Sequence, residues 1–525
     1  MADVVDENKL KRLRVVISES LRVQQGGADH IEYIDPSNTL TDIVARQNHV
    51  VFGRRGCGKT LLLHHSARLL PTSTRRVYLN CEDFKTHSFP NVLVEILTAV
   101  FRELEKNLGG WFGRKRAVRQ LVKEIIAELD RLKTEADEVN QNIKETGETS
   151  QETASSATVG AKLFEKTLDL TTSDAEKAQI KSGFEKLYQR SDIKLQKLNL
   201  AIPPFKQRIR EVFENSTNIK SVFIELDDFY HLPRAAQPHI ADFVHRLCKD
   251  VPLFFKIATL RHSSDLYAER SGQPIGIQER HDFQPINVDF TLQDFHRTEK
   301  QLRNIFHKFA EKAEISSKEF NDKLFKGDGF RRLILAGGGV PRDCLSLFLE
   351  ALENVSNQAD PRIGKDDVRQ LSLQNLQHRI QEMKRDSERS EQDALLRATF
   401  VIRQFCLDRK SNVFCISEKT LQERENLRYL FNRLFDYRII HSLDTALTHK
   451  KQPGSFQAFM IDLGSYAHMR KLDSKFREID IAEKDAKEEI RGAPVIEVAV
   501  LESFWRDAPP DVEQSLAQEL AAAAE

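Results

Sequence analysis

The sequence predicts an α/β fold built around a parallel sheet, and three observations support this. Four apolar runs, each bounded by turn residues and separated by helical segments, are typical of buried parallel strands. A glycine-punctuated loop, GRRGCGKT, joins the first run to an apolar helix, and two aspartates end the third run. The four runs are HVVFG (49–53), RVYLN (76–80), SVFIELDD (221–228) and LFFKIATL (253–260).

Composition excludes several classes of protein. Lys plus Arg and Asp plus Glu both total 79, so the whole-chain charge points to neither a nucleic acid nor a membrane. The six cysteines form no CxxC pair and no metal-ligand spacing, which fits a reducing compartment without disulfides or zinc. The acidic N-terminus does not resemble a signal peptide, and no segment has the roughly 20 apolar residues of a membrane span. We therefore expect a soluble, cytoplasmic protein with no membrane partner.

The loop GRRGCGKT satisfies the pattern G-x-x-x-x-G-K-[ST] through Gly53, Gly58, Lys59 and Thr60. Glycines let backbone amides curl around phosphate oxygens, and the following helix adds its positive N-terminal dipole. We expect Lys59 to reach the β- and γ-phosphates and Thr60 to bind Mg²⁺. A chance glycine-rich turn is the alternative, but the strand before and the helix after favour a nucleotide loop. The other loop residues of the predicted binding set are Arg54, Arg55, Gly56 and Cys57.

A phosphate loop needs a second acid to hold its metal ion, and the run SVFIELDD supplies two. Asp227 is expected to bind Mg²⁺ through water, and Asp228 to polarise the attacking water. The alternative is that these acids cap the next helix. The second acid is Asp rather than the Glu common in fast ATPases, which leaves turnover open while nucleotide binding is expected.

Two further positions are candidates for contact with a triphosphate. Thr259 ends the fourth run, where a polar side chain can touch the γ-phosphate or the attacking water, although an ordinary strand end explains it equally. GGGVPRD (337–343) lies between two amphipathic helices, and Pro341 suits a first helical turn. Arg342 would then project toward the triphosphate, with a bare turn between helices as the alternative.

A heptad seam lies between the second and third apolar runs. Its apolar residues alternate spacings of four and three over more than three repeats, which predicts a helical hairpin or coiled-coil insertion. A connector rich in Gly, Ser and Thr (145–160) and a second polar helix follow, and we expect that helix to stop at Pro203-Pro204. A solvated pair with only its own seam buried and a partner-binding arm both remain open. The seam residues are Val118, Val122, Ile125, Leu129, Leu132, Ala136, Val139 and Ile143.

As a set, these motifs resemble those of AAA+ ATPases, particularly the origin-recognition and initiator clade and its bacterial relatives. The resemblance covers roughly residues 30 to 380 apart from the insertion. It implies that the chain binds ATP and Mg²⁺, forms a homo-oligomer and inserts an arginine finger into a neighbouring subunit's site. Arg280 in QERHDF is the candidate finger, with Arg261 and Arg246 as weaker ones. The motifs are GRRGCGKT, FIELDD, KIATLRHSSDLY, QERHDFQPINVDFTLQD and AGGGVPRD.

Adenine is the expected base, because the chain has no NKxD guanine signature and no LSGGQ-like stretch. The base is expected to pack near IEYIDPS. With the resemblance, the predicted catalytic set is Asp228, Arg280, Arg342 and Thr259.

A winged-helix domain commonly follows the lid in that clade, and residues 392–466 look similar. Residues 396–451 carry 11 Lys plus Arg against 6 Asp plus Glu, so they are a candidate duplex DNA surface. Winged helices also mediate protein contacts, and a charged helix face is usually only solvated. THKKQPGS is the expected wing tip. The candidate phosphate-neutralising residues are Arg424, Arg428, Arg433, Lys450 and Lys451.

Six parts are therefore predicted along the chain, and the tail from about residue 490 is expected to add little to a core. They are an N-terminal helical segment (1–30), an AAA+ core (31–102 and 205–290), a helical insertion (103–204), a helical lid (291–380), a winged-helix-like domain (392–466) and a C-terminal helical tail (467–525).

Two functions fit this organisation. The first is an oligomerising ATPase that binds DNA and uses an arginine finger supplied in trans. The second is a nucleotide-gated switch, like the signal-transduction (STAND) relatives of the clade, that acts through protein partners. Bacterial relatives with this layout are associated with defence and mobile-element gene neighbourhoods.

Overall fold

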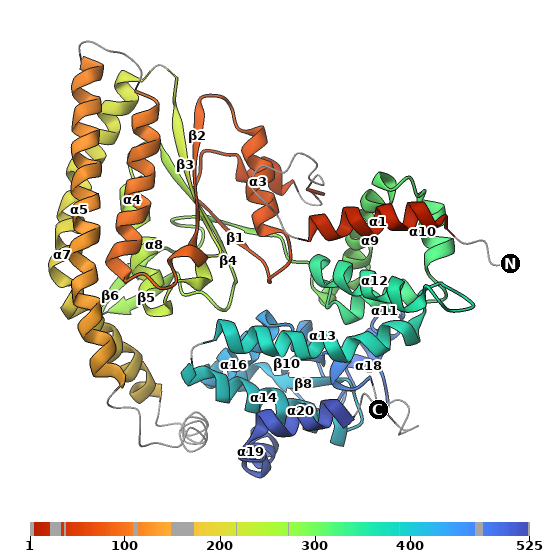
Figure 1. Ribbon diagram of the computed structural model, residues 1–525. Helices are drawn as coiled ribbons and strands as arrows, with labels where there is room; N and C mark the ends of the chain where they lie inside the picture. Colours follow the sequence, from red (N-terminus) through yellow and green to blue (C-terminus); the bar gives the residue numbers. More distant parts are fainter. Residues whose placement is uncertain are drawn as a thin grey trace.

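A five-stranded parallel sheet lies at the centre of the α/β core (Figure 1). The computed structural model describes residues 5–21, 33–35, 38–108, 114–148, 173–216, 218–270, 272–387, 389–467 and 476–522. The strand order is β2-β3-β4-β1-β7, and every neighbouring pair is parallel. All four predicted strands are confirmed. The strands are β1 (His49–Phe52), β2 (Thr74–Asn80), β3 (Ser221–Asp227), β4 (Leu253–Thr259) and β7 (Gln284–Asn287).

The strand β7 was not predicted, because its sequence QPIN is polar and contains a proline. It lies at the edge of the sheet beside β1, where a residue that cannot donate to the ladder is tolerated. The antiparallel hairpin of β5 (Tyr267–Arg270) and β6 (Gln273–Gly276) is likewise missing from the sequence prediction.

Helices cover both faces of the sheet. Val50 packs into the cluster of α4 and α8, whereas the next residue, Val51, packs with α3. A parallel sheet needs this double cover because its side chains are apolar on both faces. The helices and 3₁₀ turns of the core are α2 (Thr39–Ile43), α3 (Lys59–Leu69), η1 (Cys81–Phe84), α4 (Phe89–Lys106), η2 (Phe229–His231), η3 (Arg234–Ala236) and α8 (Gln237–Cys248).

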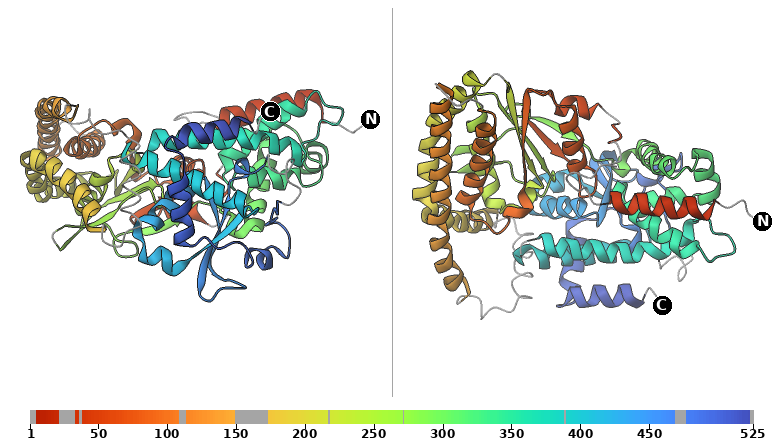
Figure 2. Two further views of the ribbon diagram at one scale, coloured as in Figure 1. Left: turned by 90° about the horizontal axis from the view of Figure 1, so that it is seen from below. Right: turned by 45° about the horizontal axis from the view of Figure 1, so that its top comes forward.

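The insertion forms two long helices, α5 (Arg114–Glu148) and α7 (Ser173–Asn215), which lie along α4 (Figures 1 and 2). The seam of α5 packs into the same hydrophobic cluster as α4, so a solvated pair that buries only its own seam is not what forms. The connector from residue 149, and the side chains of the last three predicted seam residues, lie outside what the structure describes. The buried seam residues are Val118, Val122, Leu129 and Leu132.

The predicted stop at Pro203-Pro204 is wrong, because α7 continues through both prolines. Each proline removes the hydrogen bond to the carbonyl four residues earlier. Those carbonyls belong to Asn199 and Leu200, and the Leu200 side chain is 78% exposed, so water reaches this side of the helix. Beyond the prolines, Ile209 and Val212 are fully buried in the core cluster. This burial outweighs the lost backbone hydrogen bonds.

A helical lid follows the core, and the N-terminal helix α1 (Glu7–Ser20) lies against it (Figure 2). Leu13 and Ile17 of α1 are buried among the apolar residues of the lid. Arg14 of α1 pairs with Glu353 of α12 at 3.0 Å. The lid elements are η4 (Leu292–Asp294), α9 (Phe295–Lys312), α10 (Ser317–Leu324), α11 (Gly329–Ala336), α12 (Pro341–Val355) and α13 (Lys365–Asp386).

Helices and strands alternate after the lid, in the region of the predicted winged-helix-like domain. Its sheet is antiparallel with the order β8-β10-β9, and the chain order helix, strand, helix, helix, strand, strand is that of a winged helix. The turn between β9 and β10 contains the expected wing tip. The elements are α14 (Arg389–Asp408), β8 (Val413–Ser417), α15 (Glu418–Glu423), α16 (Glu425–Asp436), β9 (Ile440–Thr448) and β10 (Ser455–Ile461).

The expectation that the tail adds little to a core is wrong. Trp505 and Leu516 are buried in the cluster that holds α14, and Arg397 of α14 donates to the Trp505 carbonyl at 3.0 Å. The apolar run APVIEVAVLESFW (493–505) supplies part of this packing. The elements after β10 are η5 (Leu463–Ser465), α18 (Ala486–Ile490), α19 (Val498–Asp507) and α20 (Val512–Ala522).

Candidate functional site

The loop GRRGCGKT connects β1 to α3 at the carboxyl end of the sheet. Gly56 and Gly58 have φ values of 87° and 92°, in the left-handed region that favours glycine. A Cβ at Gly56 would also lie 2.9 Å from Val340 Cγ1 and from Arg342 Cβ. The glycines therefore allow the tight turn and the close approach of the lid to the loop.

Lys59 is the first residue of α3 and is buried within the loop. Its Nζ donates to the Gly53 carbonyl at 2.9 Å and lies 5.9 Å from the centre of the Tyr230 ring. The ammonium is thus held at the mouth of the loop by a backbone carbonyl. From this position it can turn toward a bound phosphate.

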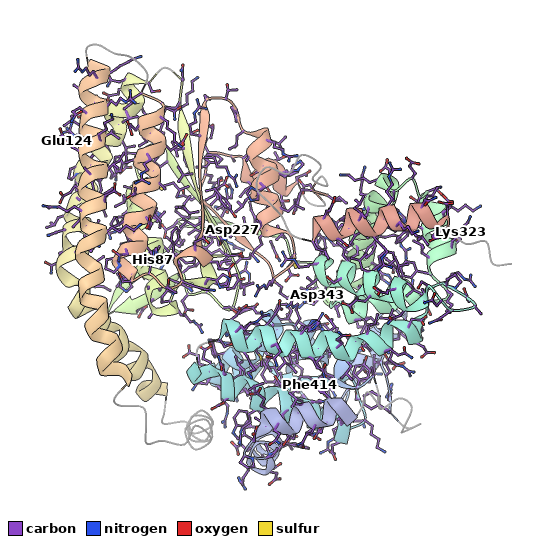
Figure 3. The ribbon with its side chains drawn as sticks, viewed as in Figure 1. His87, Glu124, Asp227, Lys323, Asp343 and Phe414 are labelled. Atoms are coloured by element: carbon purple, nitrogen blue, oxygen red, sulfur yellow. The ribbon has the colours of Figure 1, made fainter. Side chains whose placement is uncertain are left out.

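Asp227 ends β3 and lies beside the start of α3 (Figure 3). Its carboxylate accepts hydrogen bonds from the Thr60 hydroxyl and from Tyr78 Oη, the latter at 2.9 Å. Burial, followed by the charge of Asp228, raises the pKa of Asp227. The Thr60 hydroxyl and this carboxylate supply the oxygen ligands that Mg²⁺ prefers, so the residues fit a magnesium site.

Asp228 has a left-handed backbone, with φ 49° and ψ 43°. It precedes η2, but its side chain accepts no capping hydrogen bond from that turn. Its backbone N–H donates to Asp227 Oδ1 at 2.9 Å. The helix-cap alternative is therefore not realised for Asp228, and its carboxylate stays available to the site.

Thr259 lies at the end of β4 and is fully buried. Its carbonyl accepts from the Gly53 N–H at 3.4 Å, so its backbone touches the first residue of the loop. Its hydroxyl shares a hydrogen bond with Ser264 Oγ. Ser264 therefore holds the hydroxyl through which Thr259 was expected to act.

The turn between α11 and α12 brings the backbone of Arg342 to the loop, and the contact of its side chain with a triphosphate stays a prediction. Gly338 and Gly339, with φ values of 60° and 76°, turn the chain from α11 into α12, and Pro341 is the first residue of α12. The Arg342 N–H donates to the Gly56 carbonyl at 3.4 Å. The lid and the phosphate loop are therefore in direct backbone contact.

Arg280 is not brought to this site. It lies in a turn before β7, where its N–H donates to the Phe283 carbonyl at 2.8 Å. That turn meets the amino end of β1, because Asn48 Nδ2 donates to the Asp282 carbonyl at 3.2 Å. The phosphate loop follows the other end of β1. Arg280 thus lies away from its own chain's loop, and its action in trans stays a prediction.

The two weaker finger candidates have partners within the chain. Arg261 pairs with Glu279 at 3.3 Å, and its guanidinium lies 4.2 Å from the centre of the Phe52 ring. Arg246 pairs with Asp242 at 2.7 Å on the surface of α8.

An apolar cavity of about 130 Å³ opens beside the loop. Tyr33 and Ile34, from the segment IEYIDPS, line it together with Cys57, Phe309 and Arg342. Burial raises the pKa of Tyr33 to about 12, so the ring stays neutral at physiological pH. The cavity has the apolar walls and the position expected for a base that follows phosphates bound by the loop.

A buried ion pair between Arg54 and Asp289 holds the loop in place, and the sequence did not predict it. Arg54 donates from Nε and Nη2 to both carboxylate oxygens of Asp289, at 2.7 and 2.9 Å, and its side chain is 1% exposed. Cys57 Sγ lies 3.2 Å from the same carboxylate. Arg54 therefore shapes the loop from behind rather than faces a ligand, whereas Cys57 contacts the same carboxylate and also lines the cavity. An acidic residue some 235 positions away gives no local sequence signal.

The predicted DNA residues are largely paired. Arg433 is buried and donates to Glu391 Oε2 at 3.0 Å, which is contrary to the prediction that it contacts phosphate. Arg428 pairs with Glu425 at 3.5 Å, and Lys450 with Glu488 at 3.2 Å. Arg424 lies 4.0 Å from a carboxylate oxygen of Glu502. Three of these acids lie outside residues 396–451. The net charge counted over that segment alone therefore exceeds the positive charge of the folded surface.

The helix α16 docks against the ATPase core. Asp436 accepts from the His262 N–H at 3.1 Å and from Ser263 Oγ at 2.6 Å, just beyond β4. Arg438, which follows α16, donates to the Arg55 carbonyl at 3.1 Å. The winged-helix domain therefore contacts the phosphate loop directly. No sequence motif predicted this contact.

No family model and no curated protein matches the chain. Among solved structures, it is similar to the DNA-bound ORC1 protein of Aeropyrum pernix, with 14% identity, a TM-score of 0.31, and coverage of 89% of this chain and 92% of that chain. A Walker-type ATPase of Pyrococcus abyssi shows 9% identity and a TM-score of 0.37, with 85% and 99% covered. The RuvB Holliday junction branch migration motor of Thermotoga maritima shows 10% identity and a TM-score of 0.29, with 89% and 95% covered.

At these identities and TM-scores, the assignment of the fold rests on this chain's own geometry. The strand order β2-β3-β4-β1-β7 places the phosphate loop after β1 and the acid pair after β3. A helical lid and a winged helix follow in the expected order. The core has the α/β fold of a P-loop NTPase, as the motifs predicted.

Proposed function

We propose that the chain is a magnesium-dependent ATPase that couples ATP binding and hydrolysis to oligomerisation and to binding of DNA or a protein partner. One observation carries the proposal. The loop with Lys59 and Thr60 lies beside Asp227 and is touched from the lid by Arg342, at the mouth of an apolar cavity. These groups are the parts that a P-loop nucleotide site requires.

Each part has a role in binding. The loop amides hold the α- and β-phosphates, and Lys59 reaches the β- and γ-phosphates. Tyr33 and Ile34 cover the base, which we take to be adenine. Thr60 and Asp227 hold Mg²⁺, which neutralises charge on the phosphate oxygens.

Hydrolysis needs a positioned water and positive charge near the γ-phosphate. Asp228 polarises the attacking water, and Arg342 contributes charge from the lid. Thr259 acts through its backbone contact with the loop and through the Ser264 hydroxyl that holds its side chain. Arg280 of a neighbouring copy completes the site, so the active form is a homo-oligomer.

DNA binding through residues 396–451 requires the winged-helix domain to move. In this arrangement α16 is held by the core through Asp436, and Arg433 is buried. Arg428 and Lys451 keep exposed charge for phosphate contact. The insertion that carries α5 and α7 is the candidate binding arm for a protein partner.

The test is ATP turnover by the purified full chain, with and without duplex DNA. Wild-type protein is expected to release phosphate faster than Lys59→Ala, and faster still with DNA. Turnover equal to that of Lys59→Ala under every condition would refute hydrolysis. Sizing with ATP and with ADP tests the oligomer.

A nucleotide-gated switch is the second candidate, because the winged-helix domain touches the loop that would hold the nucleotide. The hydrogen bond from Arg438 to the Arg55 carbonyl favours it. A switch would change its oligomeric state with ATP while releasing little phosphate. Unchanged size in ATP, in ADP and without nucleotide would count against it.

The cellular setting has weaker support. All six cysteines are buried free thiols, which supports a reducing compartment such as the cytoplasm. Across the described residues, no helix has the length and apolarity needed to cross a membrane. The resemblance to the clade is the one support for a role in bacterial defence or mobile elements.

A further inference from the structure

The side chain of Arg55 lies where the phosphate loop meets the lid helix α13. Its Nη1 is 2.5 Å from Asp386 Oδ2, and its Nε is 3.8 Å from Glu382 Oε1. The side chain is 32% exposed, whereas that of the preceding Arg54 is 1% exposed. The two neighbouring arginines therefore differ in kind, since Arg54 is fixed inside the core and Arg55 has room to move.

Arg55 also lies within electrostatic range of Asp228. Tyr230, another neighbour of Arg55, has its ring centre 5.9 Å from the Lys59 ammonium. Asp228 follows the metal-binding Asp227 at the end of β3. Arg55 thus has acidic neighbours from two elements. The carboxylates of Asp386 and Glu382 belong to α13, and Asp228 lies where the terminal phosphate of a triphosphate is expected.

We propose that Arg55 distinguishes ATP from ADP. With ATP bound, its guanidinium contacts the γ-phosphate. Without a γ-phosphate, Asp386 and Glu382 hold it against α13. This inference rests on the proposed ATP site and adds to it the residue that reports the third phosphate.

The chemistry favours the exchange. A planar guanidinium with paired N–H donors matches phosphate oxygens and carboxylates equally well, so either can hold it. The α- and β-phosphates lie in the loop amides, and only the γ-phosphate adds negative charge on the side of Asp228. ADP therefore leaves Arg55 with its carboxylates.

The exchange also reaches the winged-helix domain. Asp386 is the last residue of α13, and α14 of the winged-helix domain begins at Arg389. Glu382, the second carboxylate, also pairs with Arg438, which donates to the Arg55 carbonyl. Movement of Arg55 changes the partners at this one joint between the loop and the winged-helix domain.

The test is equilibrium binding of ATPγS and of ADP, each with Mg²⁺, measured by calorimetry on the full chain. Arg55→Gln is expected to weaken ATPγS binding about tenfold or more, as for one charged hydrogen bond, and to leave ADP binding within about twofold. Arg55→Lys keeps the charge without the fork and should recover part of the preference. Unchanged ADP affinity shows that each variant is folded.

The carboxylates give the second arm of the test. Asp386→Asn removes a competitor for Arg55, so it is expected to strengthen ATPγS binding and to leave ADP binding unchanged. Arg68→Gln, at an exposed position on α3, is the control and should change neither nucleotide.

Four outcomes overturn the inference. Equal weakening of ATPγS and ADP by Arg55→Gln means that Arg55 only shapes the loop. Weakening of ATPγS by Asp386→Asn means that the ion pair positions the loop rather than competes for Arg55. Wild-type protein that binds neither nucleotide refutes the ATP site itself, whereas normal binding with no effect of Arg55→Gln refutes the sensor alone.

Discussion

Buried charged residues beneath the phosphate loop form one network. Asp343 is labelled in Figure 3. Arg379 donates to Asp343 at 2.8 Å and also to Asp462, and Arg438 donates to Asp343 at 3.1 Å. Asp343 directly follows Arg342 at the start of α12, so this network supports the lid residue that reaches the loop. Breaking a buried pair leaves a charge without a partner and costs about 3–5 kcal/mol.

His441 makes this network sensitive to acid. Burial, only partly opposed by Asp462, lowers the pKa of His441 to about 4. Because the unfolded chain binds the proton near pH 6.5, the stability from neutral His441 is complete above pH 6.5 and is lost as pH falls toward 4. At pH 5.5 the loss amounts to about 1.4 kcal/mol.

The measurement is the free energy of unfolding in urea at pH 7.5 and pH 5.5. His441→Asn should reduce the difference between the two by about 1.4 kcal/mol. The exposed His281→Asn should not change it. An equal difference in wild type and His441→Asn would show that His441 titrates alike in both states.

The site could be predicted from sequence where its residues are consecutive. GRRGCGKT, the acid pair after β3 and GGGVPRD each lie within one turn of the chain, so each carries its own signal. Arg433 and Asp386 carry none, because their roles depend on Glu391 and on Arg55, which distant folding brings near. The prediction that Arg433 contacts phosphate was therefore wrong, and the carboxylate partners of Arg55 were not predicted.

At the scale of elements, one part of the helices α5 and α7 packs on the core helix α4. Leu129 of α5 and Leu198 of α7 are buried with α4. The heptad seam predicted a buried stripe correctly, but a stripe does not say which helix covers it. The core helix α4 covers much of this one, and that pairing depends on the fold.

Shortening the insertion separates this part from the rest of the two helices. Removing residues 138–188 and closing the gap with a short glycine-serine linker should leave nucleotide affinity within about twofold, since the core-packed turns remain. Leu129→Asp should instead lower stability by about 3 kcal/mol or more, because it buries a charge against α4. Calorimetry and thermal unfolding measure both. Loss of nucleotide binding in the shortened chain would show that the distal helices also support the core.

At the scale of the whole molecule, the winged-helix domain is closed against the ATPase core. The contact joins Asp436 of α16 to the segment after β4, and Arg234 of the core to Tyr429 of α16. The order of domains could be predicted from the sequence, but not this docking, since it depends on single side chains from separate domains. The helix α16, which carries the candidate phosphate-neutralising residues Arg428 and Arg433, is partly covered as a result.

Loosening this contact should strengthen DNA binding. Asp436→Ala removes the acceptor for His262 and Ser263, so α16 is released and duplex DNA should bind several-fold tighter. Asp444→Ala on β9 is the control, because it removes the same charge without touching the core. Fluorescence anisotropy with a labelled duplex measures both. Equal affinities for the two variants would mean that α16 is not the DNA-contacting helix.

The central claim is that the loop between β1 and α3 binds ATP with magnesium. Equilibrium binding of Mg-ATPγS to the full chain and to Lys59→Ala tests it most directly. Wild-type protein should bind at least tenfold tighter than Lys59→Ala, since the ammonium supplies a charged contact to the phosphates. Equal affinities, or no binding by wild-type protein, would contradict the account.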